Sequence, residues 1–400
     1  MKYIILLCDG MSDEPLEELG GKTPMEAACT PHMDALAKIS ELGLVETIPP
    51  GMLPGSDTAN LSVLGYDPQK YYSGRSPLEA LSIGVDMKDT DVSFRCNFVT
   101  LSEEQEKYED KIMLDHSAGE ISTEEAEVLL KAVQENLGSS GYDFYSGVGY
   151  RHLLIESMGQ VLAMTPPHDI LMQKIAEYLP THVLFREMMQ KSYDVLQQHP
   201  INVARRAKGL GAANSIWLWG AGTRPALTDF AEKFGKKGAL TSAVDLLKGI
   251  AVGANLHNIA VAGATGGLDN DYQGQAKGAV QALLEKGYDF VYLHVEAPDE
   301  MSHHGSITKK IQAIEDIDEK VLPILLEELK KEDLRLLILP DHPTPVLLRT
   351  HTTDPVPYLL YDNRKKQVGA ASFHEKTAKA SGRLITKGHE LILRLFYSDV

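Results

Sequence analysis

Tyr3-Ile4-Ile5-Leu6-Leu7-Cys8-Asp9-Gly10 is an apolar run that ends abruptly at an acid and a glycine, and it indicates the fold class of the chain. Short apolar runs bounded by turn residues are typical of strands buried in a parallel sheet. The sequence predicts three more such strands, at residues 259–262, 290–295 and 334–339. Helical patterns lie around these runs, at residues 30–42, 240–252, 273–286 and 308–331. Strands that alternate with helices predict an α/β fold with a mostly parallel sheet flanked by helices.

The middle of the chain follows a different pattern. Between about residue 91 and residue 234 the strand signals are sparser, the loops are rich in Ser and Gly, and the helical candidate at residues 123–137 is strongly acidic. A chain of 400 residues also exceeds what one hydrophobic core usually serves. We therefore predict a catalytic domain made of residues 1–90 and 235–400, with residues 91–234 inserted into it as a smaller α+β domain.

The composition excludes several kinds of partner. A formal net charge of −17 argues against a nucleic acid, which binds basic surfaces, but it is compatible with an anionic small molecule held by metal ions or arginines. No apolar segment approaches the length of a membrane span or a signal peptide. Cys8, Cys29 and Cys96 are too few and too scattered for a disulfide framework. We expect a cytoplasmic protein without a membrane partner, and the sequence leaves its oligomeric state open.

Acidic residues follow three of the predicted strands. Asp9 comes directly after the first run, Asp299 follows the run at residues 290–295, and Asp341 follows the run at residues 334–339. In open α/β sheets, ligands bind outside the carboxyl ends of the strands. We therefore expect these carboxylates to converge at one edge of the sheet, although any one of them alone is more simply a turn or cap residue.

Histidines accompany two of these acids. His303 lies four residues after Asp299, His342 is next to Asp341, and His351 follows in the same segment. Carboxylate and imidazole ligands together suit Mn²⁺, Fe²⁺ or Zn²⁺ better than Ca²⁺. The pattern predicts a site for two divalent ions, whereas a lone histidine would be interpreted as packed or solvated.

A candidate nucleophile lies in the segment at residues 54–62, which has the pattern of a turn that leads into a helix. Ser56 or Asp57 would begin that helix, where free amide groups and the helix dipole favour a bound phosphate. An ordinary helix cap is the alternative interpretation. With a metal pair nearby, Ser56 could lose its proton and act as a nucleophile at neutral pH.

Five motifs, taken in order, resemble the cofactor-independent phosphoglycerate mutases. The motifs are Cys8-Asp9-Gly10, Gly55-Ser56-Asp57-Thr58-Ala59-Asn60-Leu61-Ser62-Val63-Leu64-Gly65-Tyr66-Asp67, Ala297-Pro298-Asp299 with His303, Pro340-Asp341-His342-Pro343-Thr344-Pro345, and His351-Thr352 with Pro355-Val356-Pro357. The resemblance is greatest to the shorter, archaeal-type branch of the family, in the alkaline phosphatase superfamily. It covers nearly the whole chain.

The resemblance implies a ligand set and a nucleophile. One ion would be held by Asp9, Ser56, Asp341 and His342, and the other by Asp299, His303 and His351. Ser56 would be the residue that carries the phosphate as phosphoserine. The ions implied are Mn²⁺, with Zn²⁺, Co²⁺ or Mg²⁺ as alternatives. His304, next to the matched His303, is expected to have no part in the site.

The resemblance also implies an activity and a role for the inserted domain. The activity is an isomerase that interconverts 3-phosphoglycerate and 2-phosphoglycerate in glycolysis and gluconeogenesis without 2,3-bisphosphoglycerate, so the partner is a small phosphorylated three-carbon acid. The inserted domain would act as a lid that grips the glycerate, and arginine suits recognition of carboxylate or phosphate. The expected substrate-binding residues are Arg95, Asn97, Arg151, Arg205 and Arg206. Asp115 or His116 could shuttle protons between the glycerate hydroxyls.

Other functions stay open at this point. A metal-dependent phosphatase or phosphodiesterase could use the same core, with water as the acceptor. A homoserine kinase-like phosphotransferase is a further alternative, because the run Trp217-Leu218-Trp219-Gly220 is similar to that subgroup, although the chain has no Gly-x-x-x-x-Gly-Lys-Ser/Thr loop. A non-catalytic protein that binds metal or phosphate is the third. The arginine-bearing insertion favours the mutase, since a closed lid excludes water.

Overall fold

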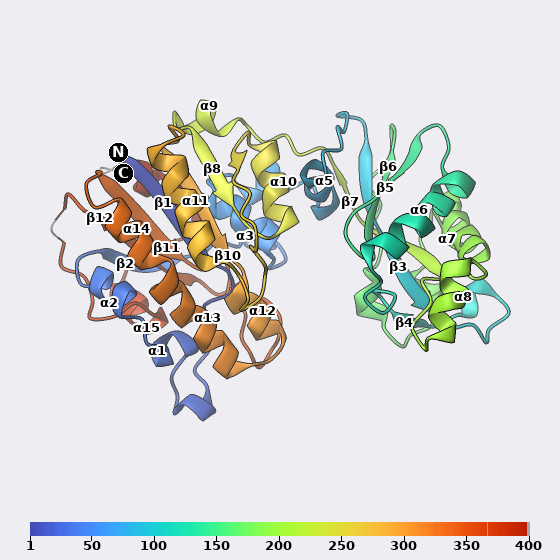
Figure 1. Ribbon diagram of the computed structural model, residues 1–400, viewed down its shortest axis with the longest axis horizontal. Helices are drawn as coiled ribbons and strands as arrows, with labels where there is room; N and C mark the ends of the chain where they lie inside the picture. The colour runs from blue at the N-terminus through green and yellow to red at the C-terminus, as the bar shows by residue number, and fades with distance from the viewer. Residues whose placement is uncertain (366, 398–400) are drawn as a thin grey trace. The chain divides into compact units, whose positions relative to one another are not determined.

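The computed structural model describes residues 1–365 and 367–397, which form two compact units (Figure 1). Unit 1 comprises Met1–Tyr72 and Ala226–Val400, and unit 2 comprises Ser73–Pro225. These boundaries differ from the predicted ones at residues 90/91 and 234/235. Helix α5 (Arg75–Ser82) packs on strands of unit 2, and α9 (Phe230–Phe234) stacks Phe230 on Phe290 of unit 1, so each belongs to the unit whose core it completes.

Unit 1 is built on one large, mostly parallel sheet, as predicted. In spatial order its strands are β13 (Leu384–Ile385), β2 (Glu41–Val45), β12 (Val356–Asp362), β11 (Leu334–Leu339), β1 (Lys2–Cys8), β10 (Phe290–Val295), β8 (Gly238–Thr241) and β9 (His257–Asn258). β12 runs antiparallel to both of its neighbours, and the other pairings are parallel.

The central strand β1 lies between β10 and β11, so three strands of distant sequence end at the same edge. Its register pairs Cys8 with Val295 of β10 and Leu7 with Leu339 of β11. Every residue of β10 and β11 is buried, which explains why these runs are apolar rather than alternating. The residues that follow the three strands therefore come together, as the strand-end acids predict.

Helices cover both faces of this sheet (Figure 1). One face packs on α11, α13, α14 and α2, while aromatic residues of α9 and α16 pack on Tyr3 and Phe290 of the other. The helices of unit 1 are α1 (Pro24–Ala27), α2 (Pro31–Ala37), α3 (Ser56–Val63), α4 (Pro68–Tyr71), α9, α10 (Asp245–Gly253), α11 (Tyr272–Leu284), α12 (Ala297–His303), α13 (Ile307–Lys320), α14 (Leu322–Glu328), α15 (Glu375–Ala380) and α16 (Leu391–Phe396).

Four of the sequence predictions have wrong boundaries. The helix predicted at residues 30–42 is α2, which ends at Ala37, and residues 41 and 42 belong to β2. The helix predicted at residues 308–331 is two helices, because Pro323 begins a new helix at the first turn of α14. The helix predicted at 240–252 begins with strand residues of β8, and only α10 is helical. The strand predicted at residues 259–262 corresponds to β9, which begins two residues earlier, at His257, and lies at the edge of the sheet.

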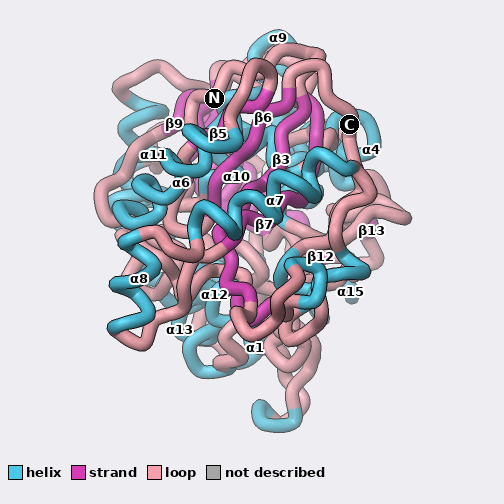
Figure 2. Tube along the Cα trace, turned by 90° about the vertical axis from the view of Figure 1, so that its right-hand side faces the viewer, coloured by secondary structure: helices cyan, strands magenta, loops and turns pink. Residues whose placement is uncertain are grey.

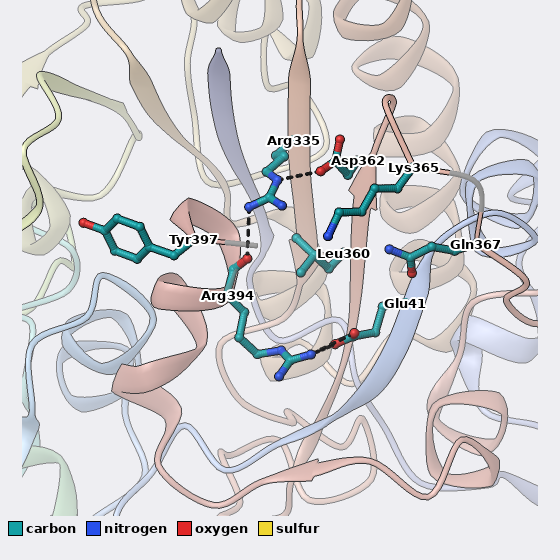
Figure 3. A pocket seen from close by; sticks show the side chains of 8 residues that line it. All are labelled: Glu41, Arg335, Leu360, Asp362, Lys365, Gln367, Arg394 and Tyr397. Carbon is teal, nitrogen blue, oxygen red and sulfur yellow. Dashed lines mark hydrogen bonds and ion pairs between the residues drawn. The ribbon is translucent and has the colours of Figure 1, made fainter. Parts of the chain in front are cut away.

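The opposite end of the sheet from the strand-end acids carries charges that are paired with one another (Figure 3). Arg335, at the start of β11, donates to Asp362 Oδ2 at 2.8 Å, and both side chains are almost fully buried. Arg394 of α16 donates to both carboxylate oxygens of Glu41 at 2.8 Å. These pairs tie α16 to the sheet around a cavity of only about 40 Å³. A cavity of that size, lined by two arginine–carboxylate pairs, is a poor candidate for a substrate site.

Unit 2 is an α+β unit with more strands than its sequence suggests. Its sheet is antiparallel, with β3 in the centre, and α6 and α7 complete one hydrophobic core with it (Figure 2). Its elements are α5, β3 (Val92–Leu101), β4 (Met113–Asp115), α6 (Thr123–Leu137), β5 (Tyr142–Tyr145), β6 (Arg151–Glu156), α7 (Val183–Leu196), α8 (Pro200–Ala207) and β7 (Ser215–Thr223). In neither unit does a described helix combine the length and apolar content needed to cross a bilayer.

Candidate active site

Ser56 is the first residue of α3, as the sequence predicts, and its side chain is half-buried. Gly55 precedes the helix in an extended conformation, and no side chain caps the helix start. Ser56 Oγ lies 3.2 Å from His342 Nε2. The serine therefore lies at a helix N-terminus and also at the edge of the sheet where the acids gather, so it is more than a helix cap.

The first group of ligand candidates contains Asp9, His342 and Asp341. His342 Nε2 lies 3.6 Å from Asp9 Oδ1 and 3.3 Å from Asp341 Oδ2, and all three side chains are buried. The second oxygen of Asp341 accepts hydrogen bonds from the backbone N–H groups of Gly10 and His342, at 3.2 and 2.9 Å. Two of the segments that follow strands are thereby fastened to each other.

The second group contains Asp299, His303 and His351. His303 Nε2 lies 3.1 Å from Asp299 Oδ2 and 3.0 Å from His351 Nε2, and His351 Nε2 lies 3.5 Å from Asp299 Oδ1. His351 also stacks on His342 of the first group, with 3.9 Å between ring centroids. One ligand atom from each of Asp299, His303 and His351 falls within 4.8 Å of the others, and the same holds for Asp9, Asp299 and His342. Asp299 thus belongs to both sets.

The residue that follows Asp9 must be a glycine, because of its backbone conformation and its close neighbours. Its φ is 59°, in the left-handed region, and a Cβ there would lie 2.5 Å from Asp299 Oδ1 and 2.6 Å from Thr344 Oγ1. Thr344 donates to Asp299 Oδ1 at 2.5 Å. The backbone at Gly10 therefore lies directly against the carboxylate of Asp299, and only a residue without a side chain fits there.

These residues fit divalent cations. Asp9 Oδ1 is buried and accepts no hydrogen bond from any residue that the structure describes. Burial, and then the neighbouring carboxylates of Asp341 and Asp299, raise the pKa of Asp9 well above its usual range. A cation among these oxygens would remove that repulsion. His303 differs, because its hydrogen bond with Asp299 raises the pKa of the imidazole to about 9.

Four residues support the ligands although the sequence analysis did not single them out. Asn60 donates to Asp341 Oδ2 at 2.8 Å, and Tyr292 donates to Asn60 Oδ1 at 2.5 Å. His294 Nε2 lies 2.9 Å from Asp9 Oδ2, and His294 Nδ1 lies 3.0 Å from Ser242 Oγ. The available signal was the alternation of Tyr292 and His294 in an otherwise apolar strand, since polar residues buried in a strand need partners. The exposed side chain of His304 lies 3.3 Å from Glu300.

In unit 2, one group of basic and aromatic side chains contains several of the predicted substrate-binding residues. Arg95 is buried, lies 2.9 Å from Glu79, and places its guanidinium 4.3 Å from the ring centroid of Trp219. Asn97 accepts a hydrogen bond from Trp219 Nε1 at 3.1 Å and donates to the carbonyl of His116 at 3.4 Å. The sequence thus predicted Arg95, Asn97 and His116 separately, and the structure places them in one group.

Three further side chains belong to this group. His168 packs its ring 5.3 Å from Trp219 and 6.0 Å from His116, measured between centroids. The exposed Arg151 lies over the ring of Tyr150, which also packs on His116. Sequence reasoning missed His168, which lies in the short 3-10 helix Pro167–Ile170, because only the fold brings it beside Trp219.

The other candidates in unit 2 are engaged elsewhere. Arg205 is buried, pairs with Glu125 at 2.5 Å and donates to the carbonyl of Ala118 at 2.6 Å. Arg206 pairs with Glu103 at 2.5 Å. Both arginines therefore hold the unit together and do not join the group around Trp219.

Asp115 is likewise occupied by its own loop. Burial would raise the pKa of Asp115, but hydrogen bonds from Ser117 and Gly119 outweigh burial and lower it. The carboxylate thus orders residues 115–119.

Comparison with known proteins identifies the family of the chain. A model of the 2,3-bisphosphoglycerate-independent phosphoglycerate mutase family matches residues 37–202. The chain is 47% identical over 400 residues to the protein of that name from Methanosarcina barkeri, covering 98% of each chain. It is 48% identical over 398 residues to a probable enzyme of the same name from Geobacter sulfurreducens, again covering 98% of each. A solved structure of the cofactor-independent phosphoglycerate mutase from Thermoplasma acidophilum aligns over 99% of both chains, with 26% identity and a TM-score of 0.66.

Proposed function

Since the chain belongs to the 2,3-bisphosphoglycerate-independent phosphoglycerate mutase family, we propose that Ser56 is the residue that carries the phosphoryl group during its reaction. The protein is an isomerase that interconverts 3-phosphoglycerate and 2-phosphoglycerate. The observation that supports Ser56 most is its position: it begins α3 and lies 3.2 Å from His342, among the acids and histidines of the candidate ligand groups.

Two divalent ions would be held by the two groups of ligand candidates described above. We propose Mn²⁺, which accepts mixed carboxylate and imidazole ligands. When bound, the pair would stabilise negative charge on the attacking and leaving oxygens. The proposed ligands are Asp9, Ser56, Asp341 and His342 for one ion, and Asp299, His303 and His351 for the other.

The reaction then consists of two transfers of one phosphoryl group. Ser56 Oγ gives up its proton and attacks phosphorus, the bond to the 3-oxygen of glycerate breaks, and that oxygen takes a proton. The glycerate turns, its 2-oxygen loses a proton and attacks the phosphoserine, and Ser56 is restored. The amide groups at the start of α3 face the negative charge of the phosphoryl group in both transfers.

We infer that unit 2 acts as the lid and grips the glycerate between the two transfers. The guanidinium of Arg151 is exposed and suits the carboxylate of the glycerate. Arg95, through Glu79, and Asn97, through Trp219, hold the group around Trp219 in place. His116 and His168 are imidazoles that could pass protons between the two hydroxyls. Burial lowers the pKa of His168, so it is neutral at pH 7 and able to accept a proton.

A product assay tests this proposal. Metal-reconstituted protein is incubated with 3-phosphoglycerate, and 2-phosphoglycerate and free phosphate are measured separately. We expect 2-phosphoglycerate as the main product. Release of mainly free phosphate would instead identify a phosphatase, in which water takes the phosphoryl group from Ser56.

Two arginine variants test the grip of unit 2. Arg151→Met removes an exposed guanidinium of the group around Trp219, and we expect lower mutase turnover with a larger fraction of free phosphate. Arg206→Met removes an arginine that pairs with Glu103, and we expect an unchanged product ratio. Wild-type turnover in Arg151→Met would show that the glycerate is held elsewhere.

A further inference from the structure

Strand β10 carries two polar side chains, Tyr292 and His294, at alternate positions between apolar neighbours, and both are fully buried. Neither is a candidate metal ligand. We propose that Tyr292 and His294 are positioning residues, which fix the oxygen that each of two ligand carboxylates presents to its metal ion. This inference rests on the two-metal site of the proposed function.

The His294 branch acts on Asp9. The backbone N–H of Val244 donates to Ser242 Oγ at 2.9 Å, and Ser242 Oγ lies 3.0 Å from His294 Nδ1. An ionised carboxylate only accepts hydrogen bonds, so His294 Nε2 must donate to Asp9 Oδ2, and Nδ1 must accept from Ser242. Every group in this series of hydrogen bonds thus has one consistent role: the carboxylate of Asp9 selects the tautomer of His294, and the hydroxyl of Ser242 donates to its Nδ1.

The consequence for Asp9 is that its two oxygens are different. Oδ2 accepts from His294, whereas Oδ1 is buried and receives no hydrogen bond from the described residues. A buried carboxylate oxygen without a donor is costly unless a cation meets it. Oδ1 is also the oxygen that lies 3.6 Å from His342, on the side of the other ligand candidates.

The Tyr292 branch acts on Asp341 through Asn60. Tyr292 donates to Asn60 Oδ1, which turns the amide so that its NH₂ group faces Asp341 Oδ2 at 2.8 Å. The same NH₂ group also donates to the carbonyl of Ser56 at 2.8 Å. Without the tyrosine hydroxyl the amide could rotate, and its oxygen would then face the carboxylate of Asp341. Tyr292 therefore acts on a ligand and on the residue proposed as nucleophile.

Both branches belong to one strand but act on segments that follow other strands. Asp9 follows β1, and Asp341 follows β11. β10 pairs with β1, so its side chains at alternate positions reach the layer under both carboxylates. Partners that orient metal ligands in this way typically change metal affinity by about 10–100-fold when removed.

The experiment compares metal affinity in variants of nearly equal size. His294→Gln keeps an N–H donor at the position of Nε2, and His294→Met keeps the length without the donor. Tyr292→Phe removes only the hydroxyl. Mn²⁺ dissociation constants are measured by calorimetry on the metal-stripped full chain, together with the melting temperature of the metal-free protein. We expect a dissociation constant raised about 10–100-fold in His294→Met and Tyr292→Phe, and raised less than about 3-fold in His294→Gln.

The outcomes separate this inference from the function on which it rests. Equal dissociation constants for His294→Met and His294→Gln, whether both raised or both unchanged, overturn the positioning role of His294 and leave the metal site standing. Failure of the unmodified protein to bind Mn²⁺ overturns the metal site and this inference together. If His294→Met does not fold, Tyr292→Phe and Ser242→Ala are compared with the unmodified protein, and an unchanged affinity in both overturns the proposal.

Discussion

The two ends of the main sheet use the same kinds of residue to opposite effect. At the carboxyl ends of the central strands, Asp9, Asp299 and Asp341 gather with imidazoles, and within the described residues none of the three forms an ion pair with Lys or Arg. Burial and neighbouring acids raise the pKa of Asp9 well above its usual range. This end is electrostatically incomplete without a cation.

At the other end every acid in Figure 3 has a guanidinium beside it. Asp362 is bound by Arg335 and Arg364, and Glu41 is bound by Arg394. Burial would raise the pKa of Asp362, but the hydrogen bonds from the two arginines lower it to about 2. The comparison teaches that a buried acid indicates function when its partners are other acids and imidazoles, and stability when its partners are arginines.

The largest effect is expected at the incomplete end. Ser56→Ala should lower mutase turnover by about 10⁴-fold or more, because no other nucleophile would take the phosphoryl group. Since Ser56 makes no cap hydrogen bond, the free energy of unfolding should change by less than about 1 kcal/mol. A coupled assay for 2-phosphoglycerate and a thermal melt measure the two quantities. Substantial turnover would place the nucleophile elsewhere, with Thr58 or Ser62 as the next candidates.

At the paired end we expect the opposite pattern, a large loss of stability with little change in turnover. Arg335→Met leaves the buried Asp362 with only the partly exposed Arg364, and we expect a loss of about 3 kcal/mol in the free energy of unfolding. The turnover number should stay within about 2-fold of the unmodified value, because the change lies at the far end of β11. Denaturant unfolding and the mutase assay measure the two effects. A large fall in turnover at unchanged stability would contradict the division between the two ends.

Metal ions should stabilise the incomplete end specifically. Adding Mn²⁺ at about 100 times its dissociation constant should raise the free energy of unfolding of the metal-stripped protein by about 2.7 kcal/mol for each ion bound. The same increment is expected in Arg335→Met, since that variant keeps the ligand groups. It should fall to about half in Asp9→Asn with Asp341→Asn, because that variant lacks ligands of one proposed ion and keeps Asp299, His303 and His351 for the other. Thermal melts with and without Mn²⁺ provide the comparison. An equal increment in the double variant would show that the stabilising ions bind elsewhere.

The smallest effect is a pH dependence of the paired end. The pKa of Asp362 in the folded protein is about 2, below the value of about 3.9 in an unfolded chain. Its stabilisation is therefore fully present above about pH 5 and is lost as the pH falls toward 2, with a size of at most about 2.6 kcal/mol. Asp362→Asn should remove this dependence between about pH 5 and pH 2, measured by urea unfolding. A variant that keeps the full dependence would assign it to other acids.

The strand-end acids were the part of the site that the sequence could predict. Asp9, Asp299 and Asp341 follow apolar runs directly, and parallel strands end at one edge, so local pattern and a general rule are sufficient. The fold class was predicted for the same reason. The helix at residues 308–331 was not divided correctly, because the periodic pattern continues through Pro323, where the chain starts a new helix.

Residues whose roles depend on neighbouring strands could not be predicted. His294 meets Asp9 only because β10 pairs with β1 in a particular register, and no local pattern encodes that pairing. Arg205 and Arg206 show the opposite case: two adjacent arginines suggest an anion site, but Glu125 and Glu103, distant in sequence, decide their role. Tertiary partners, rather than residue type, distinguish the paired Arg205 and Arg206 from the exposed Arg151.

The central position of β1 has a consequence for the order in which the chain folds during synthesis. β1 leaves the ribosome long before its partners β10 and β11, which begin at Phe290 and Leu334. Unit 2, by contrast, is one uninterrupted segment, Ser73–Pro225, with its own core. Unit 2 can therefore fold before β10 and β11 are synthesised and pair with β1, since long-range parallel pairing forms last. During that interval both edges of an apolar strand are open, so a pause in translation before residue 290 would expose the nascent chain to aggregation more than a pause after residue 339.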